Sequence, residues 1–403
     1  MPVLRTLALT AALVLAAAVA HAQVSDGVVK IGVMNDQSGT YADLAGPGSV
    51  VAARMAIEDS GAAKKGLKVE VLVADHQNKP DVGSSIARQW YDADKVDLIV
   101  DVPTSSVVLA VNQVAREKNK ALIVSTGATS DLTGPACSPN ALHWTYDTWS
   151  LANGTGQAIV KTGGDTWFFL TADYKFGHDL ERDTEAVVVK NGGKVVGKVR
   201  HPFPTADFSS FLLQAQASKA KIIGLANAGA DTTNAIKQGA EFGIVRGGQQ
   251  FAGLLVFLTD VHALGLEKAQ GLLLTESFYW DLNDQTRAFS KRFAERHRGA
   301  MPTMAQAGVY SAVLHYLKAV EALKSDEGPK VIARMKDMPT DDPIFGKGRV
   351  RPDGRKIHPM YLFEVKKPSE SKGAWDYYKV RSTIPIDQAF RPMDQGNCPL
   401  VKK

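Results

Sequence analysis

Three clusters of small hydroxylated residues follow short apolar segments in the first third of the chain, at 38–41, 103–106 and 125–130. Parallel sheets bind ligands at the carboxyl ends of their strands, which is where these clusters would lie. The second and third clusters also open helical segments, so their hydroxyl and free amide groups can hold an anion such as a carboxylate. Ser and Thr are equally common as helix caps, and both interpretations stay open here.

Signatures of catalysis, cofactor binding and metal binding are missing from the sequence. Gly46-Pro47-Gly48 lies between a strand-like and a helical segment, but 35–45 intervene where a dinucleotide-binding turn would follow the strand directly. The nine histidines have no close ligand spacing, and neither a Gly-x-Ser-x-Gly elbow nor a phosphate-binding loop occurs. We expect no enzyme, no cofactor and no metal; a periplasmic hydrolase with dispersed catalytic residues is the remote alternative.

Two stretches of alternating strand-like and helical segments would position these clusters. In the first, strand-like runs at 28–34, 67–74, 96–100 and 121–125 alternate with helices at 48–60, 80–94 and 106–118. The rhythm restarts after 145–150, with strand-like runs at 166–171, 194–199 and 222–226 separated by helices. Because strands joined by helices pair in parallel, the sequence predicts an α/β protein with two parallel-sheet lobes.

The last third of the chain follows a different pattern. It contains a strand-like run at 271–275 and helical segments at 285–298, 304–323 and 330–338. A β-hairpin is predicted to join 346–350 to 360–365 through the turn Arg351-Pro352-Asp353-Gly354-Arg355, because Asp-Gly favours such turns. The residues after Ser382 have three prolines and little periodicity, which predicts an extended tail.

The first 22 residues are typical of a cleavable secretory signal peptide. Arg5 is their only charge, an apolar run extends from Leu7 to Ala20, and Ala20-His21-Ala22 fits the cleavage pattern. No cysteine follows the cleavage site to carry a lipid, so we expect a freely soluble periplasmic protein without an anchor. The net charge of +5 is too small to indicate a nucleic-acid partner.

Cys137 and Cys398 are the only cysteines. In an oxidising compartment, an even pair is most simply a disulfide. The sequence therefore predicts a bridge that holds the C-terminal tail beside the loop at 134–140.

The order of several short motifs resembles a known family. Val29–Val33 is followed by Ser38-Gly39, then Asp75-x-x-Asn78-x-Pro80, then Ser125-x-Gly127-Ala128-Thr129, then 172–177, which reads Ala-Asp-Tyr-Lys-Phe-Gly. This order is similar to the type I periplasmic solute-binding proteins of the branched-chain amino acid transporter class. The resemblance implies two α/β lobes, three hinge crossovers, a ligand in the central cleft, an ABC transporter permease as partner, and a monomer.

The resemblance also implies that each lobe is discontinuous in sequence. Residues 1–22 would be the signal peptide, 23–147 and 281–345 the N-terminal lobe, and 148–280 and 346–381 the C-terminal lobe. Residues 382–403 would return to the N-terminal lobe as an extended tail. The three crossovers would lie near 145–150, 275–281 and 345–349.

In the family's amino-acid binders, a Ser or Thr after the third strand and an Ala-Thr pair after the fourth hold the ligand carboxylate. The matching residues are Thr104 with Ser105, and Ala128 with Thr129. The second lobe of those binders adds an aromatic residue before a glycine, which corresponds to Phe176, with Tyr174 close by.

The sequence departs from the amino-acid binders where they place a Glu that accepts the ligand's ammonium group. The corresponding segment, 251–257, contains no acid, and Asn227 and Ala228 replace larger residues after the preceding strand. A carboxylate clamp without an ammonium acceptor, in a cavity edged by aromatic residues, predicts an apolar organic acid, with aromatic acids first. These aromatic residues are Tyr41, Phe176, Phe257 and Phe278. The alternative is an amino acid or amide whose ammonium group pairs with Asp231.

Overall fold

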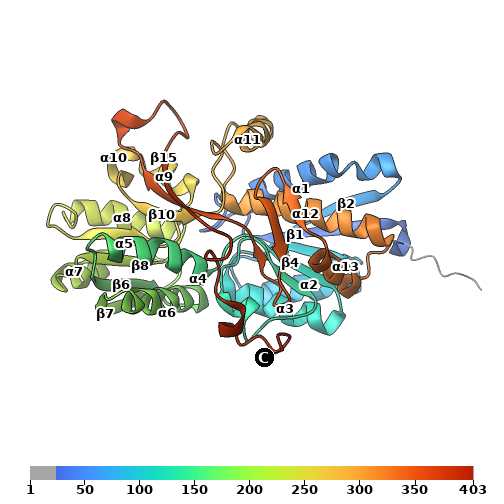
Figure 1. The fold of residues 1–403 in the computed structure, drawn as a ribbon, viewed down its shortest axis with the longest axis horizontal. Helices are drawn as coiled ribbons and strands as arrows, with labels where there is room; N and C mark the ends of the chain where they lie inside the picture. The colour runs from blue at the N-terminus through green and yellow to red at the C-terminus, as the bar shows by residue number, and fades with distance from the viewer. Residues whose placement is uncertain (1–23, 403) are drawn as a thin grey trace, which may run out of the picture.

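A computed structural model describes residues 24–402, so the predicted signal peptide lies outside the described residues. The chain forms two lobes, each built on a parallel sheet (Figure 1). The predicted fold class is therefore confirmed. No helix among the described residues combines the length and the apolar character needed to cross a membrane.

The first lobe contains a five-stranded parallel sheet in the order β2-β1-β3-β4-β5. Its strands are β1 (Val28–Asn35), β2 (Lys68–Asp75), β3 (Leu98–Asp101), β4 (Ala121–Val124) and β5 (Ala141–His143). Successive side chains of a strand point to opposite faces, so Leu98 and Val100 join one apolar core while Ile99 joins another. Both faces of this sheet are therefore buried, as a parallel sheet requires.

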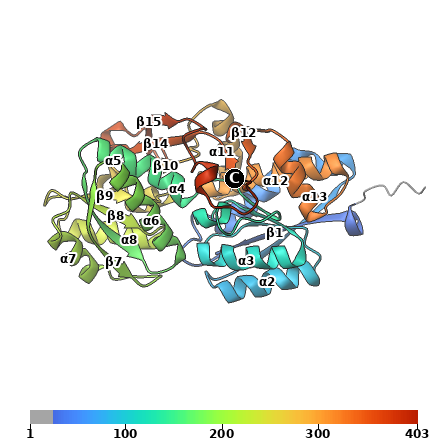
Figure 2. The ribbon, with the colours of Figure 1, turned by 60° about the horizontal axis from the view of Figure 1, so that its bottom comes forward.

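Helices cover the two faces of the first sheet (Figure 2). One face carries α1 (Gly46–Ser60) and α12 (Met304–Leu323), which pack together, and α13 (Gly328–Asp337) adjoins α12. The other carries α2 (Pro80–Asp92) and α3 (Ser105–Lys118). Helix α12 begins at a capping box formed by Thr303 and Gln306, and it is buried almost all round because it is apolar on most of its surface.

The second lobe contains a four-stranded parallel sheet in the order β7-β6-β8-β9. Its strands are β6 (Thr166–Ala172), β7 (Lys194–His201), β8 (Ile222–Ala226) and β9 (Gln250–Gly253). Its helices include α6 (Lys175–Lys190), α7 (Ser209–Ala217), α8 (Ala230–Glu241) and α9 (Leu258–Leu264). An antiparallel sheet of β10 (Leu273–Glu276), β14 (Met360–Val365) and β15 (Tyr378–Ile384) completes this lobe.

The predicted hairpin near residue 350 is correct in its turn and wrong in its second strand. Arg351 N–H donates to Arg355 O across the turn at 2.9 Å, and Gly354 has the positive φ of +86° that favours glycine. However, β12 (Gly346–Val350) pairs with β13 (Lys356–Ile357), whereas Met360–Val365 forms β14 and pairs with β10 and β15.

Two buried cations explain this difference. Arg355 ends the turn and Lys356 follows it. The Arg355 side chain lies 3.5 Å from Asp147, and the Lys356 side chain lies 3.4 Å from Asp342. These pairs hold β12 and β13 against the first lobe. The chain therefore reaches the sheet of the second lobe only at 358–360, later than the third crossover expected near 345–349. The other two connections between the lobes are 144–147, after β5, and 277–283, after β10.

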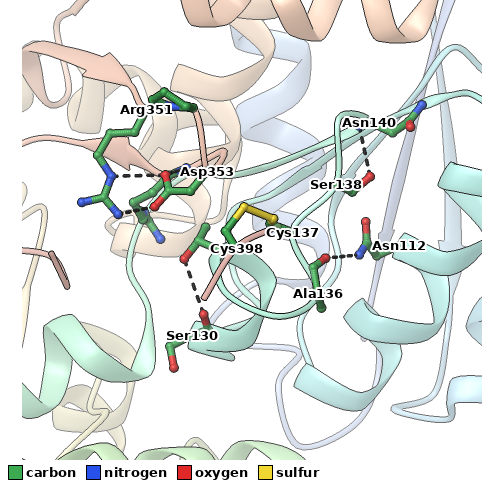
Figure 3. Close-up of a disulfide and its surroundings, with 12 residues drawn as sticks. Asn112, Ser130, Ala136, Cys137, Ser138, Asn140, Arg351, Asp353 and Cys398 are labelled. Carbon is green, nitrogen blue, oxygen red and sulfur yellow. Dashed lines mark hydrogen bonds and ion pairs between the residues drawn. A yellow bond between two sulfur atoms is a disulfide. The ribbon is translucent and has the colours of Figure 1, made fainter. Parts of the chain in front are cut away.

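The predicted disulfide between Cys137 and Cys398 is confirmed (Figure 3). It joins residues 261 positions apart, with a Cα–Cα distance of 5.6 Å. Arg391 of the tail also donates to Ser130 O at 2.9 Å, and Arg351 donates to Arg391 O at 2.8 Å. The tail is thus attached to the first lobe by a covalent bond and by hydrogen bonds.

Replacing both cysteines with serine is expected to lower the free energy of unfolding by about 2 to 5 kcal/mol. Without the bridge that closes a long loop, the unfolded chain gains conformational entropy and becomes more favourable. Urea unfolding of the wild type with and without reductant measures this loss. The double variant serves as the control, because reductant should leave its midpoint unchanged. Equal midpoints for all samples would contradict the expectation.

Candidate ligand-binding site

A small cavity, with a volume of about 20 Å³, lies between the lobes, where the strand-end loops of both sheets meet. The first lobe contributes the loops after β1, β3 and β4 together with Tyr146 in the first crossover, and the second lobe contributes the loops after β6, β8 and β9. The lining residues are Tyr41, Leu44, Pro103, Thr104, Ser105, Thr126, Ala128, Tyr146, Tyr174, Phe176, Ala228, Leu255 and Phe257.

Most of the residues predicted from the sequence lie together around this cavity. They are Tyr41, Thr104, Ser105, Ala128, Tyr174, Phe176, Ala228 and Phe257. Five further lining residues were not predicted from the sequence: Leu44, Pro103, Thr126, Tyr146 and Leu255. Pro103 and Thr126 belong to clusters that the sequence singled out, so only the choice of residue failed there. Tyr146 had no local signal, because it lies in a crossover rather than in a strand-end loop.

Three predicted residues lie outside the cavity wall, and each has a structural partner instead. Thr129 Oγ1 donates to Asp179 Oδ2 of the second lobe at 2.6 Å. The Asn227 amide binds the ring of His201 at 3.1 Å and accepts a hydrogen bond from Thr232, both within its own lobe. The Phe278 ring packs edge-on against Phe289 at 6.1 Å in the hydrophobic core.

The loop between β3 and α3 has an unusual backbone. Three non-glycine residues have positive φ: Asp101 (87°) at the end of β3, and Val102 (50°) and Thr104 (78°) in the loop itself. Such conformations cost about 1 to 3 kcal/mol each and persist only where surrounding contacts enforce them. The strain places Thr104 and Ser105 at the cavity, and sequence patterns carry no signal for it.

The carboxylate of Asp101 holds this loop in place. It is fully buried and accepts hydrogen bonds from Asn35 Nδ2 at 2.9 Å, from Ser125 Oγ at 3.1 Å and from Thr126 Oγ1. Burial raises the pKa of Asp101, while these hydrogen bonds act in the opposite direction. Asp101 therefore joins the ends of β1, β3 and β4 beneath the cavity.

The start of α3 is suited to a negative group. Its first amide groups have no acceptor within the helix, and the helix dipole places a partial positive charge there. The Thr129 N–H donates to Ser105 Oγ at 3.1 Å, so the Ser105 hydroxyl proton remains available. This end of the cavity therefore offers neutral hydrogen-bond donors to an anion.

Aromatic side chains join the lobes at one side of the cavity. The hydroxyl groups of Tyr41, in the first lobe, and Tyr174, in the second, share a hydrogen bond. The Phe203 ring stacks on both, with centroid distances of 5.4 Å to Tyr41 and 4.5 Å to Tyr174. Burial raises the pKa of both tyrosines, so both stay neutral.

A polar contact joins the lobes at another point. Lys175 Nζ, at the start of α6, lies 2.5 Å from Asp131 Oδ2 of the first lobe and 2.7 Å from Asp179 Oδ1 of its own helix. The same Asp179 accepts the Thr129 hydroxyl. The strand-end loop after β4 therefore lines the cavity with Ala128 and holds the second lobe with Thr129 and Asp131.

No charged side chain lines the cavity, but an acid lies close behind its wall. Asp231 is 1% exposed, and burial raises its pKa to about 7. Its Oδ1 accepts the Thr205 N–H at 3.0 Å. His201 lies 3.9 Å away, and burial lowers its pKa, so it provides no positive charge to Asp231 near neutral pH.

The chain is similar to solved structures along nearly its whole length. A periplasmic binding protein from Burkholderia mallei is 52% identical with a TM-score of 0.91, and the match covers 93% of this chain and 100% of that one. A branched chain amino acid ABC transporter periplasmic ligand-binding protein from Burkholderia xenovorans LB400 is 42% identical, with a TM-score of 0.82. The match covers 92% of this chain and 99% of that one.

More distant relatives share the fold. The Leu/Ile/Val-binding protein homolog 6 of Brucella melitensis is 27% identical over 380 residues, or 91% of this chain and 94% of the relative. An ABC transporter solute binding protein from R. palustris, solved in complex with benzoate, is 20% identical, with a TM-score of 0.80. The match covers 89% of this chain and 97% of that one. The periplasmic binding protein family itself matches residues 28–374, so the chain belongs to this family, which supplies ABC transporters with solute-binding proteins.

Proposed function

We propose that the protein captures a small apolar organic acid, with an aromatic carboxylate as the first choice, and delivers it to the permease of an ABC importer. The observation that carries this ligand class is the cavity wall, where hydroxyl groups, amide groups and aromatic rings meet without a charged side chain. The cavity volume of about 20 Å³ is far below that of occupied ligand pockets, roughly 300 to 1,000 Å³, so the lobes would have to move apart to admit even a small ligand.

The energies are consistent with tight binding. Burying about 150 Å² of an aromatic ring at about 25 cal/mol/Å² contributes roughly 4 kcal/mol. Each hydrogen bond to a charged carboxylate adds about 1.5 to 3 kcal/mol, so several of them offset the cost of association. Micromolar affinity, about −8 kcal/mol, is therefore within reach.

Closure of the lobes would couple binding to transport. Tyr174, Phe176 and Phe257 of the second lobe complete the cavity that the first lobe begins, so a ligand contacts both lobes only when they approach each other. Its binding energy then shifts the balance toward the closed form that the permease recognises. We propose that a single chain is sufficient for this cycle.

Two alternatives are weighed against this proposal. A branched-chain or other amino acid would bring an ammonium group, and the cavity wall has no acid to pair with it. Burying that charge unpaired would cost several kcal/mol, unless Asp231 moved into the wall. A periplasmic hydrolase would convert its ligand, whereas mass spectrometry should recover an unchanged ligand from a binding protein.

Replacing Ser105 with alanine is expected to weaken benzoate binding at least tenfold, because a hydrogen bond to a charged group contributes about 1.5 to 3 kcal/mol. Isothermal titration calorimetry of the protein, refolded to remove bound ligand, measures this loss. Ser106→Ala changes the next residue of α3, which lies outside the cavity wall, and should leave the affinity unchanged. Binding of branched-chain amino acids without any binding of aromatic acids would overturn the proposed ligand class.

The buried Asp231 carboxyl predicts a pH-dependent stability. The pKa of Asp231 is about 7 in the folded protein, against an ordinary value of 3.8. The unfolded chain therefore loses this proton first, and the free energy of unfolding falls as the pH rises from about 4 to about 7. Asp231→Asn should remove this loss, so its stability relative to the wild type should rise by about 2 to 3 kcal/mol between pH 5 and pH 8.

Urea unfolding at the two pH values tests this expectation. Asp341→Asn, at an exposed aspartate, is the matched control and should differ from the wild type equally at both pH values. A pH-independent difference for Asp231→Asn would show that Asp231 ionises normally, and it would strengthen the amino-acid alternative.

A further inference from the structure

Six hydroxyl groups belong to residues of the cavity wall, and the direction of their hydrogen bonds limits what they can offer a ligand. For three of them, the partner inside the protein is an atom that can only accept. Such a hydroxyl must donate its single proton to that partner, so lone pairs are all that it can offer a ligand.

Thr126 is the first of these. Its Oγ1 bonds to Asp101 Oδ1, and a carboxylate accepts without donating. Asn35 and Ser125 donate to the same carboxylate, which keeps Asp101 an acceptor. The Thr126 proton is therefore committed to Asp101.

Thr104 is the second. Its Oγ1 bonds to Asn78 Oδ1, and the Asn78 amide group is oriented by its own donation to Asp36 Oδ2 at 2.6 Å. Asp36 in turn accepts the backbone N–H groups of Gly39, at 2.6 Å, and Tyr41, at 2.9 Å. This series of hydrogen bonds turns the Asn78 amide oxygen toward Thr104, so the Thr104 hydroxyl must be the donor.

Tyr146 is the third. Its hydroxyl donates to the backbone carbonyl of Thr126 at 2.6 Å, and a carbonyl oxygen never donates. The protons that remain for a ligand are those of Ser105 and one of the Tyr41–Tyr174 pair, together with the amide groups at the start of α3.

The residues of the cavity wall therefore offer donors and three hydroxyl groups that can only accept, and a plain carboxylate satisfies only the donors. We infer that the native ligand carries, besides its carboxylate, a neutral hydrogen-bond donor such as a ring hydroxyl group, which is received by the acceptors of Thr104, Thr126 and Tyr146. An ammonium group is a poor match for this role, because none of the three acceptors is charged. This inference rests on the proposed capture of an aromatic carboxylate and narrows it to hydroxylated acids.

Titration calorimetry with a matched set of ligands tests the inference on the wild-type protein. The set is benzoate, 3-hydroxybenzoate, 4-hydroxybenzoate, and the two corresponding methoxybenzoates, whose ether oxygen accepts but cannot donate. At least one hydroxybenzoate is expected to bind tenfold or more tightly than benzoate, and its methoxy counterpart should lose that gain. The inference would be overturned if benzoate bound as tightly as both hydroxybenzoates, or if each methoxybenzoate bound as tightly as its hydroxy counterpart. Either result would leave the proposed function standing. No binding of any of these acids would overturn both.

A pair of variants locates the effect. Tyr146→Phe removes one acceptor from the cavity wall, so the preference for the better hydroxybenzoate over benzoate should fall at least threefold. Tyr91→Phe is the matched control, because the buried Tyr91 hydroxyl also donates to a backbone carbonyl, that of Ala121 at 2.9 Å, but lies outside the cavity wall. An unchanged preference in both variants would contradict the role of Tyr146. Should Tyr146→Phe fail to fold, the ligand series on the wild type still decides the inference.

Discussion

The candidate binding site depends on the hydrogen bonds of one buried group, the carboxylate of Asp101. A charge in the protein interior is tolerated only when hydrogen bonds replace its lost hydration. Asn35 supplies them from the end of β1, and Ser125 and Thr126 from the end of β4, while Asp101 itself ends β3. The need to satisfy one acid therefore ties β1, β3 and β4 together at the edge where the ligand would sit, and it holds the strained loop that starts α3.

A second set of buried charges connects this site to the hinge. Arg355 lies beside Asp147 and donates to the backbone carbonyl of Tyr146 at 3.0 Å, so the strand that precedes the third crossover also positions a residue of the cavity wall. Burial lowers the pKa of Lys356 to about 8, and its ammonium group lies against the rings of Trp144 and Phe345. Buried pairs of this kind contribute little net stability, but removing one partner is costly. They act mainly by defining where the chain bends.

The contacts between the lobes divide into two kinds. Around the cavity they are neutral, with Tyr41, Tyr174 and Phe203 stacked together. Just outside the cavity wall they are charged, with Lys175 between Asp131 and Asp179. The ion pairs between the lobes are thus partly exposed, whereas hydroxyl groups of the cavity wall are bonded to partners inside the protein.

The sequence by itself determined the two parallel-sheet lobes, because the alternation of apolar strands and helices is a local pattern. It also determined the disulfide, by the parity of two cysteines, and most of the cavity wall, since loops at the carboxyl ends of parallel strands meet at one edge. Tertiary structure alone decided that Thr129 donates to Asp179, that β13 stays with the first lobe, and that the hydroxyl groups of Thr104, Thr126 and Tyr146 donate to partners inside the protein. Each of these depends on a partner that folding brings near from elsewhere in the chain, and a hydroxyl group carries no sign of which partner will take its proton.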